Sequence, residues 1–133
     1  MVLATRIIPV LLADGGALVK GKQFGQQRII GHVRQAARVY DMRQCDELIV
    51  LDVTATTEDR GPDFDLVRDL ASECFMPLTV GGGVRTLDHF KQLINGGADK
   101  VAINSAAIES PSLVREAAEK FGRQAVVVSI DVR

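Results

Sequence analysis

The sequence has 133 residues, of which 47% are hydrophobic and 25% are charged, a composition typical of one globular domain and not of a disordered chain. The formal net charge is −1, basic and acidic side chains are interspersed and tryptophan is absent, so neither a basic stripe nor a stacking surface favours nucleic acid as a partner. The apolar runs are far shorter than the ~20 residues that span a bilayer, so we expect no membrane association and a cytoplasmic location.

Apolar runs alternate with segments of helical periodicity along the whole chain. The runs predict strands at 7–12, 48–53, 77–80, 101–104 and 125–130, and the periodic segments predict helices at 30–43, 63–73, 86–96 and 110–121. Thr86 and Ser110 are typical helix N-caps, and Gly122 is a typical C-terminal stop. Because unbroken apolar strands joined by crossover helices are characteristic of parallel sheets, we predict an α/β fold.

Two architectures suit this order, an open doubly wound sheet and a (β/α) barrel. A dinucleotide-binding sheet would carry G-x-G-x-x-G directly after its first strand, but Leu12 is followed by Ala13-Asp14-Gly15-Gly16. We therefore predict half of a (β/α)8 TIM barrel, with residues 1–133 forming a single unit of four strand–helix pairs and a fifth strand. One of the last two strands would expose an apolar edge, so we expect a piece of a longer barrel or a homo-oligomer that covers the edge.

Two patterns in the sequence carry no site in our interpretation. Residues Gly16 to Lys22 have the spacing of a nucleotide-hydrolase phosphate loop, but Gln23 stands where that loop needs Ser or Thr, and no amphipathic helix follows. Cys45 and Cys74 lack the spacing of metal ligands. We expect these cysteines to be buried, reduced thiols, and we predict no metal site.

The glycines at 81–83 are a better candidate for binding phosphate, since they lie directly between a predicted strand and a capped helix. Without side chains, Gly82 and Gly83 allow the backbone N–H groups to approach an anion closely. Asn104 and Ser105 end the next strand, and parallel strands place these ends at the same mouth of a barrel. We predict a phosphate site at these four residues; the alternative is a turn and a cap without a ligand.

Several motifs occur in the order of a known family. They are Arg6-Ile-Ile-Pro-Val, Leu51-Asp52-Val-Thr54-Ala, Val80-Gly-Gly-Gly-Val-Arg-Thr, Gly97-Ala-Asp-Lys100-Val-Ala-Ile-Asn104-Ser-Ala-Ala and Ala125-Val-Val-Val-Ser-Ile-Asp131. With them the chain resembles, from end to end, the N-terminal half of the HisF family, the cyclase subunit of imidazole glycerol phosphate synthase. The resemblance implies a ribulose-phosphate-binding barrel of two similar halves, each with one phosphate site.

The resemblance also implies an activity in histidine biosynthesis. The family is a carbon–nitrogen lyase and cyclase that needs no cofactor, and ammonia from a glutaminase partner closes the ring of a phosphorylated ribulosyl intermediate. Two aspartates at the ends of strands one and five transfer protons, as ring closure and elimination require. Asp131 matches the strand-five acid, but Leu12 stands at the strand-one position, so we expect an incomplete or impaired cyclase. Asp14 would face the same side as Leu12 only if the strand continued, which Gly15 and Gly16 make doubtful.

Arg6, Glu47 and Lys100 each directly precede a strand, which places them at the amino-terminal mouth of a barrel. The resemblance implies that they form an ammonia gate and that the neighbouring Asp99 contacts the glutaminase. The alternative is a ring of ion pairs that only stabilises the barrel.

Lys20 and Asp52 match family positions near the active site, where the resemblance implies that they screen and orient a substrate phosphate. The alternatives are a solvated loop charge and a strand-end cap. The chain keeps the gate residues but lacks the strand-one acid. This combination also resembles a branch of the family in which the barrel conducts ammonia for sugar amidation. A third hypothesis is a stand-alone phosphate-binding half-barrel, and all three keep a phosphorylated, sugar-like ligand or a glutaminase as the expected partner.

Overall fold

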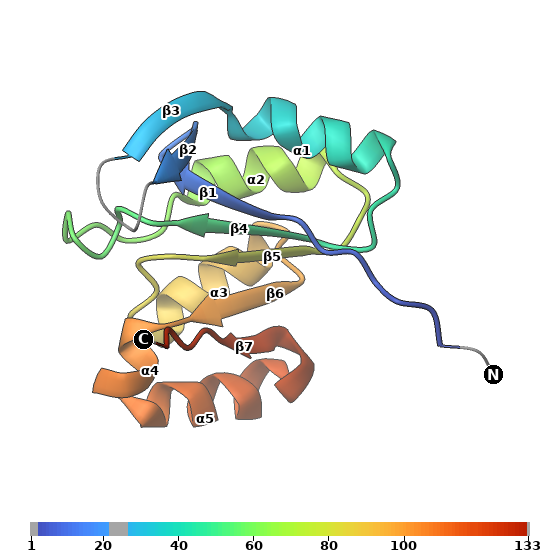
Figure 1. Ribbon diagram of the computed structural model, residues 1–133. Coiled ribbons are helices and arrows are strands. Elements are labelled where there is room, and N and C mark those ends of the chain that lie inside the picture. The colour runs from blue at the N-terminus through green and yellow to red at the C-terminus, as the bar shows by residue number, and fades with distance from the viewer. Residues whose placement is uncertain (1–2, 22–26, 133) are drawn as a thin grey trace.

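The structure is a computed structural model that describes residues 3–21 and 27–132. A seven-stranded sheet in the order β3-β2-β1-β4-β5-β6-β7 runs through it (Figure 1). The strands are β1 (Val10–Asp14), β2 (Ala17–Gly21), β3 (Gln27–His32), β4 (Leu48–Asp52), β5 (Leu78–Gly81), β6 (Lys100–Ile103) and β7 (Val126–Val128). The helices are α1 (Val33–Met42), α2 (Phe64–Glu73), α3 (Leu87–Asn95), α4 (Ser105–Glu109), α5 (Pro111–Phe121) and the 3-10 turn η1 (Arg123–Ala125).

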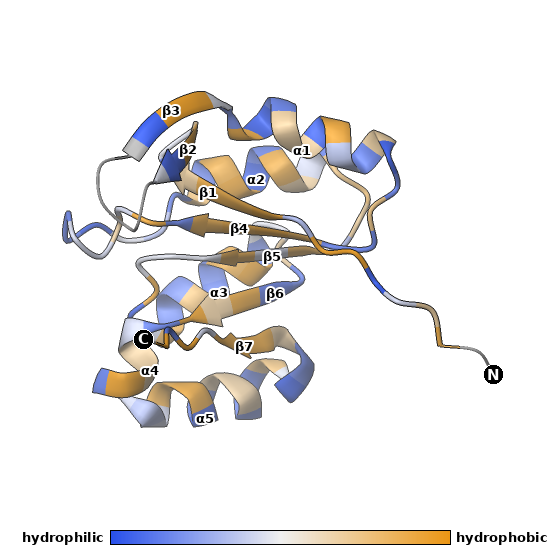
Figure 2. Ribbon diagram, viewed as in Figure 1, coloured by the Kyte–Doolittle hydropathy of each residue, from blue (hydrophilic) through white to orange (hydrophobic). Residues whose placement is uncertain are grey.

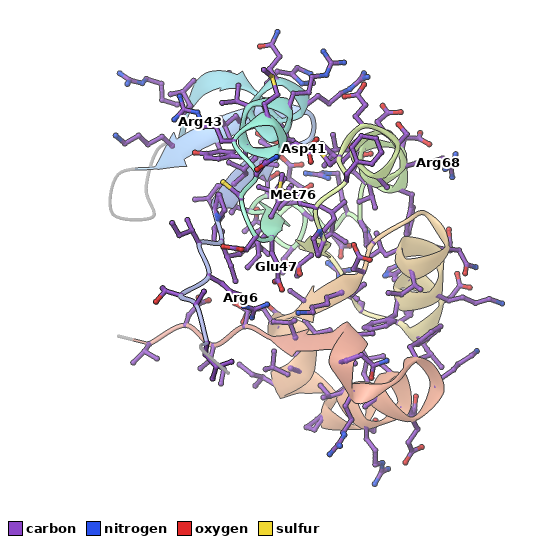
Figure 3. The ribbon with its side chains drawn as sticks, turned by 90° about the vertical axis from the view of Figure 1, so that its right-hand side faces the viewer. Arg6, Asp41, Arg43, Glu47, Arg68 and Met76 are labelled. Carbon is purple, nitrogen blue, oxygen red and sulfur yellow. The ribbon has the colours of Figure 1, made fainter. Side chains whose placement is uncertain are left out.

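Strands β1, β4, β5, β6 and β7 are parallel neighbours, which confirms the predicted parallel core of a half-barrel. Their carboxyl ends therefore form one rim of the sheet, called here the carboxyl rim, and their amino ends form the opposite amino rim. Seen from the amino rim, the helices surround one side of the sheet (Figure 3). We call this covered side the outer face and the opposite side the inner face.

Alternation along each strand decides which side chains enter the core. On β1 and β4 the buried residues Leu11, Ala13, Leu48 and Val50 alternate with more accessible ones, so the buried set points to the helices. The largest fully buried side chains are Phe90, Leu48, Leu70, Leu78, Leu93, Ile103, Val33 and Val101. Phe90 of α3 stacks on Phe121 of α5 with ring centroids 5.0 Å apart, which joins these two helices. The core thus lies between the outer face and the helices.

The inner face follows from the strand register. Leu12 pairs with Leu51, Leu51 with Gly81, Gly81 with Ala102 and Ala102 with Val127. In a parallel sheet, paired residues point to the same side, so these five form one row across the inner face. Gly81 is needed in this row, because a Cβ there would lie 2.9 Å from both Leu51 Cδ2 and Ala102 Cβ.

The antiparallel hairpin of β2 and β3 was not predicted. Gly15 makes a tight turn with φ 59°, after which the chain pairs back on the end of β1 and continues as two strands. The predicted helix at 30–43 therefore begins at Val33, after the N-cap His32. Strand β2 begins directly after Gly16 and includes Gly21, so these glycines do not form a phosphate loop; Lys22 and Gln23 lie outside the described residues.

Helix ends agree with the predicted caps except at one position. Thr86 Oγ1 accepts a hydrogen bond from His89 N at 3.1 Å, and Asp63 caps α2 through Leu66 N at 3.0 Å. Ser110 occupies the N-cap of α5, but its side chain makes no capping bond; Pro111 starts that helix instead. Ser105 was expected at the end of a strand and instead begins the short helix α4.

Several exposed apolar side chains lie on the two segments that flank the parallel sheet, where the ribbon includes hydrophobic stretches (Figure 2). These are Leu3, Ile7 and Val10 before or in β1, and Val128, Ile130 and Val132 in or after β7. Among the described residues, β4 is the only strand that pairs with Val10, Leu11 and Leu12, and β6 is the only strand that pairs with β7. Both outer strands of the parallel sheet thus carry an open, apolar edge.

None of the described helices has the length and hydropathy to cross a membrane.

A charged cluster joins α1 and α2 on the outer surface. Glu73 accepts hydrogen bonds from Arg34 Nη2 at 2.5 Å and from Arg38 Nε and Nη2 at 3.0 and 2.8 Å. Hydrogen bonds from Arg38 and Arg34 lower the pKa of the Glu73 carboxyl from an ordinary value of 4.5 to about 2. The carboxylate therefore stabilises the packing of the two helices while it is charged.

The pH dependence of the stability of a Glu73 variant tests this cluster. A folded-state pKa below the unfolded one contributes stability above pH ~4.5 that is lost as the pH falls towards about 2. Chemical denaturation should therefore find Glu73→Gln less stable than the parent at pH 7, and this difference should vanish near pH 2. Glu116→Gln, on the exposed face of α5, is the control, and an equal loss in both variants would contradict the assignment.

Candidate functional site at the two rims of the sheet

The predicted substrate residues lie along the carboxyl rim, with one exception. Asp52 ends β4, Gly82 and Gly83 follow β5, Asn104 and Ser105 follow β6, and Asp131 follows β7. The ends of β6 and β7 are in direct contact, since Asn104 Nδ2 donates a hydrogen bond to Asp131 Oδ2 at 3.0 Å. The exception is Lys20, which lies exposed on β2, opposite Arg28 in the hairpin and without an ion pair to any described residue.

The glycine turn is built for close backbone contact. Gly82 and Gly83 have φ values of 104° and 72°, a region that side chains with a Cβ rarely adopt. A Cβ at Gly82 would overlap the carbonyl oxygen of Asp52, and one at Gly83 would come 2.7 Å from the carbonyl oxygen of Arg60. Glycine is required here by packing alone, whether or not a ligand binds.

Some backbone donors on this rim remain free for a ligand, those of Gly83 and Ser105 among them. Among the hydrogen bonds of the described residues, none is donated by the backbone N–H of Gly83 or of Ser105. Gly81 pairs with Ala102, so the turns that follow β5 and β6 are neighbours. Backbone N–H groups that converge at strand ends can bind an anion.

Asp52 serves the local structure of its own loop. Its Oδ1 accepts hydrogen bonds from Thr54 N at 3.0 Å and Ala55 N at 3.1 Å, and its Oδ2 accepts one from Arg60 Nη1 at 3.1 Å. Only 9% of the Asp52 side chain is exposed. These contacts make Asp52 a strand-end cap, which is the structural alternative considered for it.

The doubt about the end of the first strand was wrong. β1 extends through Asp14, and the alternation places Asp14 on the inner face with Leu12. Gly15 makes the turn only after Asp14, which is why the two glycines do not interrupt the strand. Asp14 Oδ1 accepts a hydrogen bond from Thr54 Oγ1 at 2.9 Å, so a carboxylate lies two residues above Leu12 on the inner face.

The amino rim brings the three predicted gate residues together; Figure 3 labels two of them, Arg6 and Glu47. Glu47 Oε1 accepts hydrogen bonds from Arg6 Nη1 at 2.5 Å and from Lys100 Nζ at 3.4 Å. Only 10% of the Glu47 side chain is exposed, so this carboxylate is almost buried between two cations. Asp99 accepts a hydrogen bond from Leu78 N at 2.8 Å and thereby also caps the start of β5.

Two features of the rims escaped the sequence analysis. Arg60 contacts both Asp52 and Thr54 from a loop without periodicity, and eight residues separate it from Asp52. At the amino rim, Asp41 Oδ1 accepts hydrogen bonds from Phe75 N and Met76 N at 3.0 and 3.3 Å (Figure 3). At this rim the side chain of Phe75 is 94% exposed and that of Met42 is 82% exposed.

Both cysteines are free thiols, but Cys45 is only half-buried, unlike Cys74.

Comparison with known proteins identifies the family of the chain. Residues 6–133 match the family described as "Histidine biosynthesis protein". The whole chain is 50% identical to the imidazole glycerol phosphate synthase subunits HisF of Streptomyces griseus and Streptomyces coelicolor, and 49% identical to that of Frankia casuarinae. It spans about half the length of these relatives, 53% for the two Streptomyces proteins and 52% for the Frankia protein. The chain belongs to the histidine biosynthesis protein family, as a half-barrel related to the N-terminal part of HisF.

Proposed function

We propose that this chain supplies one phosphate-binding half of a HisF-type cyclase site at the carboxyl rim. The observation that carries the proposal is the pair of free backbone donors, Gly83 N and Ser105 N, on neighbouring strand ends. Asn104 adds a side-chain amide beside them, and we propose that Lys20, exposed on the hairpin, supplies a cation. Such a set fits one phosphate group of a phosphorylated, sugar-like substrate.

Asp131 is the proposed acid or base of the reaction. Its carboxylate is exposed on the rim and is oriented by the hydrogen bond from Asn104. Ring closure with ammonia and the accompanying C–N cleavage both require proton transfer, which a carboxylate at this place can perform. Leu12 has no transferable proton, so turnover by this rim is proposed to be impaired.

The amino rim is proposed as an ammonia entrance that faces a glutaminase. Its supports are the ion pairs of Glu47 and the large exposed apolar side chains Met42 and Phe75 at the same rim. Exposed apolar groups rimmed by charges are typical of protein interfaces. The relatives are named as subunits of a synthase, which supports a partner subunit.

A second candidate function is ammonia conduction without cyclase chemistry. Leu12 at the β1 end of the inner row favours it, because Leu12, Leu51, Ala102 and Val127 line that row with apolar groups only. An apolar lining excludes the charged ammonium ion more strongly than neutral ammonia, and it offers no group for proton transfer. In this case glutaminase binding persists while the ribulosyl intermediate is not consumed.

A second copy of the chain is proposed to cover the inner face. The open edges of β1 and β7 are apolar and parallel, and such edges are normally paired. A dimer that joins β7 of one copy to β1 of the other would pair both edges and enclose the two inner faces.

The phosphate site is tested with inorganic phosphate as the probe. In the parent chain, phosphate should shift the amide NMR signals of Gly83 and Ser105 and leave those of Asp99 and Lys100, at the opposite rim, unchanged. Gly83→Ala should weaken binding at least about tenfold in calorimetry, because the added Cβ meets the carbonyl oxygen of Arg60.

Gly31→Ala is the matched control for this experiment, since a Cβ there has only an ordinary contact with Leu18 at 3.9 Å. Its phosphate affinity should equal that of the parent. Absence of saturable binding by the parent, or shifts confined to other residues, would refute the proposed site.

The glutaminase surface is tested by charge substitution. Phe75→Asp and Met42→Asp should each weaken association with a glutaminase subunit of an imidazole glycerol phosphate synthase by about tenfold, because they place a carboxylate in an apolar contact. Ile108→Asp is the control, since this side chain is 81% exposed but lies on α4, beyond the carboxyl rim. Surface plasmon resonance measures all three, and equal affinities would argue against an interface at the amino rim.

A further inference from the structure

One side chain, Arg60, joins the ends of two parallel strands. Its Nη1 donates to Asp52 Oδ2 at 3.1 Å, at the end of β4. Its Nη2 donates to Thr54 Oγ1 at 2.7 Å and lies 3.8 Å from Asp14 Oδ1, at the end of β1. Thr54 Oγ1 in turn donates to Asp14 Oδ1, so the hydroxyl bridges the guanidinium and the inner-face carboxylate.

The backbone of the same residue supports a third strand end. Arg60 N donates to Ala55 O at 2.7 Å, which closes the loop after β4. The carbonyl oxygen of Arg60 then packs against Gly83, in the turn after β5, so tightly that a Cβ could not be accommodated. Residues from the ends of β1, β4 and β5 therefore meet at Arg60.

Charged groups hold the side chains of this cluster in fixed positions. The Asp52 carboxylate is nearly buried and is held by two backbone N–H groups as well as the guanidinium. Hydrogen bonds with Glu58 and Asp52 raise the pKa of Arg60, so the guanidinium stays charged. Charge-assisted hydrogen bonds to a poorly solvated carboxylate are stronger than neutral ones. The Asp14 side chain, in contrast, is 43% exposed and remains open to a ligand on the inner face.

We propose that Arg60 is a positioning residue of the carboxyl-rim site: it holds the phosphate-binding turn at Gly83 and the inner-face carboxylate of Asp14 in a fixed relation. The inference rests on the proposed phosphate site and extends that site to the loop of Arg60, which the sequence analysis did not identify. A purely local role would tie the loop to Asp52 without any effect on ligand affinity.

The test compares phosphate affinity with local backbone protection in the full chain. Arg60→Ala should weaken the binding of inorganic phosphate by about tenfold or more, the effect of losing a charge-assisted hydrogen bond. It should also accelerate amide exchange at Thr54 and Ala55, which donate to Asp52. Millimolar guanidinium should restore much of the affinity, because it can occupy the vacated site. Arg68→Ala, which removes an exposed arginine from α2, should change neither quantity (Figure 3).

The outcomes separate the inference from the proposed function. Faster exchange at Thr54 and Ala55 with unchanged phosphate affinity would overturn the positioning role and leave the phosphate site intact. Weaker affinity without rescue by guanidinium, accompanied by a general loss of protection in the core strands, would show that Arg60 acts through global stability and would overturn it as well. If the parent chain binds no phosphate, the proposed site fails and this role of Arg60 fails with it.

Discussion

The parallel alignment of β1, β4, β5, β6 and β7 is the constraint on which the rest of the structure depends. Parallel strands need crossover helices, and these helices bury the outer face of the sheet. The same alignment gathers all strand starts at one rim and all strand ends at the other. Charged residues that precede strands and polar residues that follow them are thereby sorted to opposite rims, whatever their separation in sequence. Glu47 and Lys100 meet for this reason although 53 residues separate them.

The two rims differ in the kind of interaction that organises them. At the amino rim, long side chains converge on the almost buried carboxylate of Glu47. Ion pairs of this kind contribute little net stability but fix the positions of both cations. At the carboxyl rim, close backbone packing dominates: Gly82 lies against Asp52, and Gly83 against Arg60. The rim that we propose to bind phosphate is thus held by main-chain contacts, which leaves backbone N–H groups available.

Periodicity and strand direction made the main parts of this arrangement predictable. Apolar runs gave the parallel strands to within a few residues, and the glycines at 81–83 marked a turn at the correct rim. The hairpin was missed because 17–32 shows no regular alternation and ends with a histidine cap. Asp14 was misjudged because a glycine pair can follow a strand as well as interrupt it. Arg60 could not be found, since the contacts of a loop arginine depend on tertiary packing and leave no periodic signal.

The central claim concerns the inner face and the two open edges, which we propose to be covered by a second copy of the chain. Exposed apolar residues at β1 and β7, together with the apolar inner row, favour a second copy as the cover. Light scattering over a range of concentrations measures the solution mass of the chain directly. The account predicts a stable mass of twice that of one chain down to micromolar concentration. A monodisperse monomer that stays soluble at high concentration would contradict it.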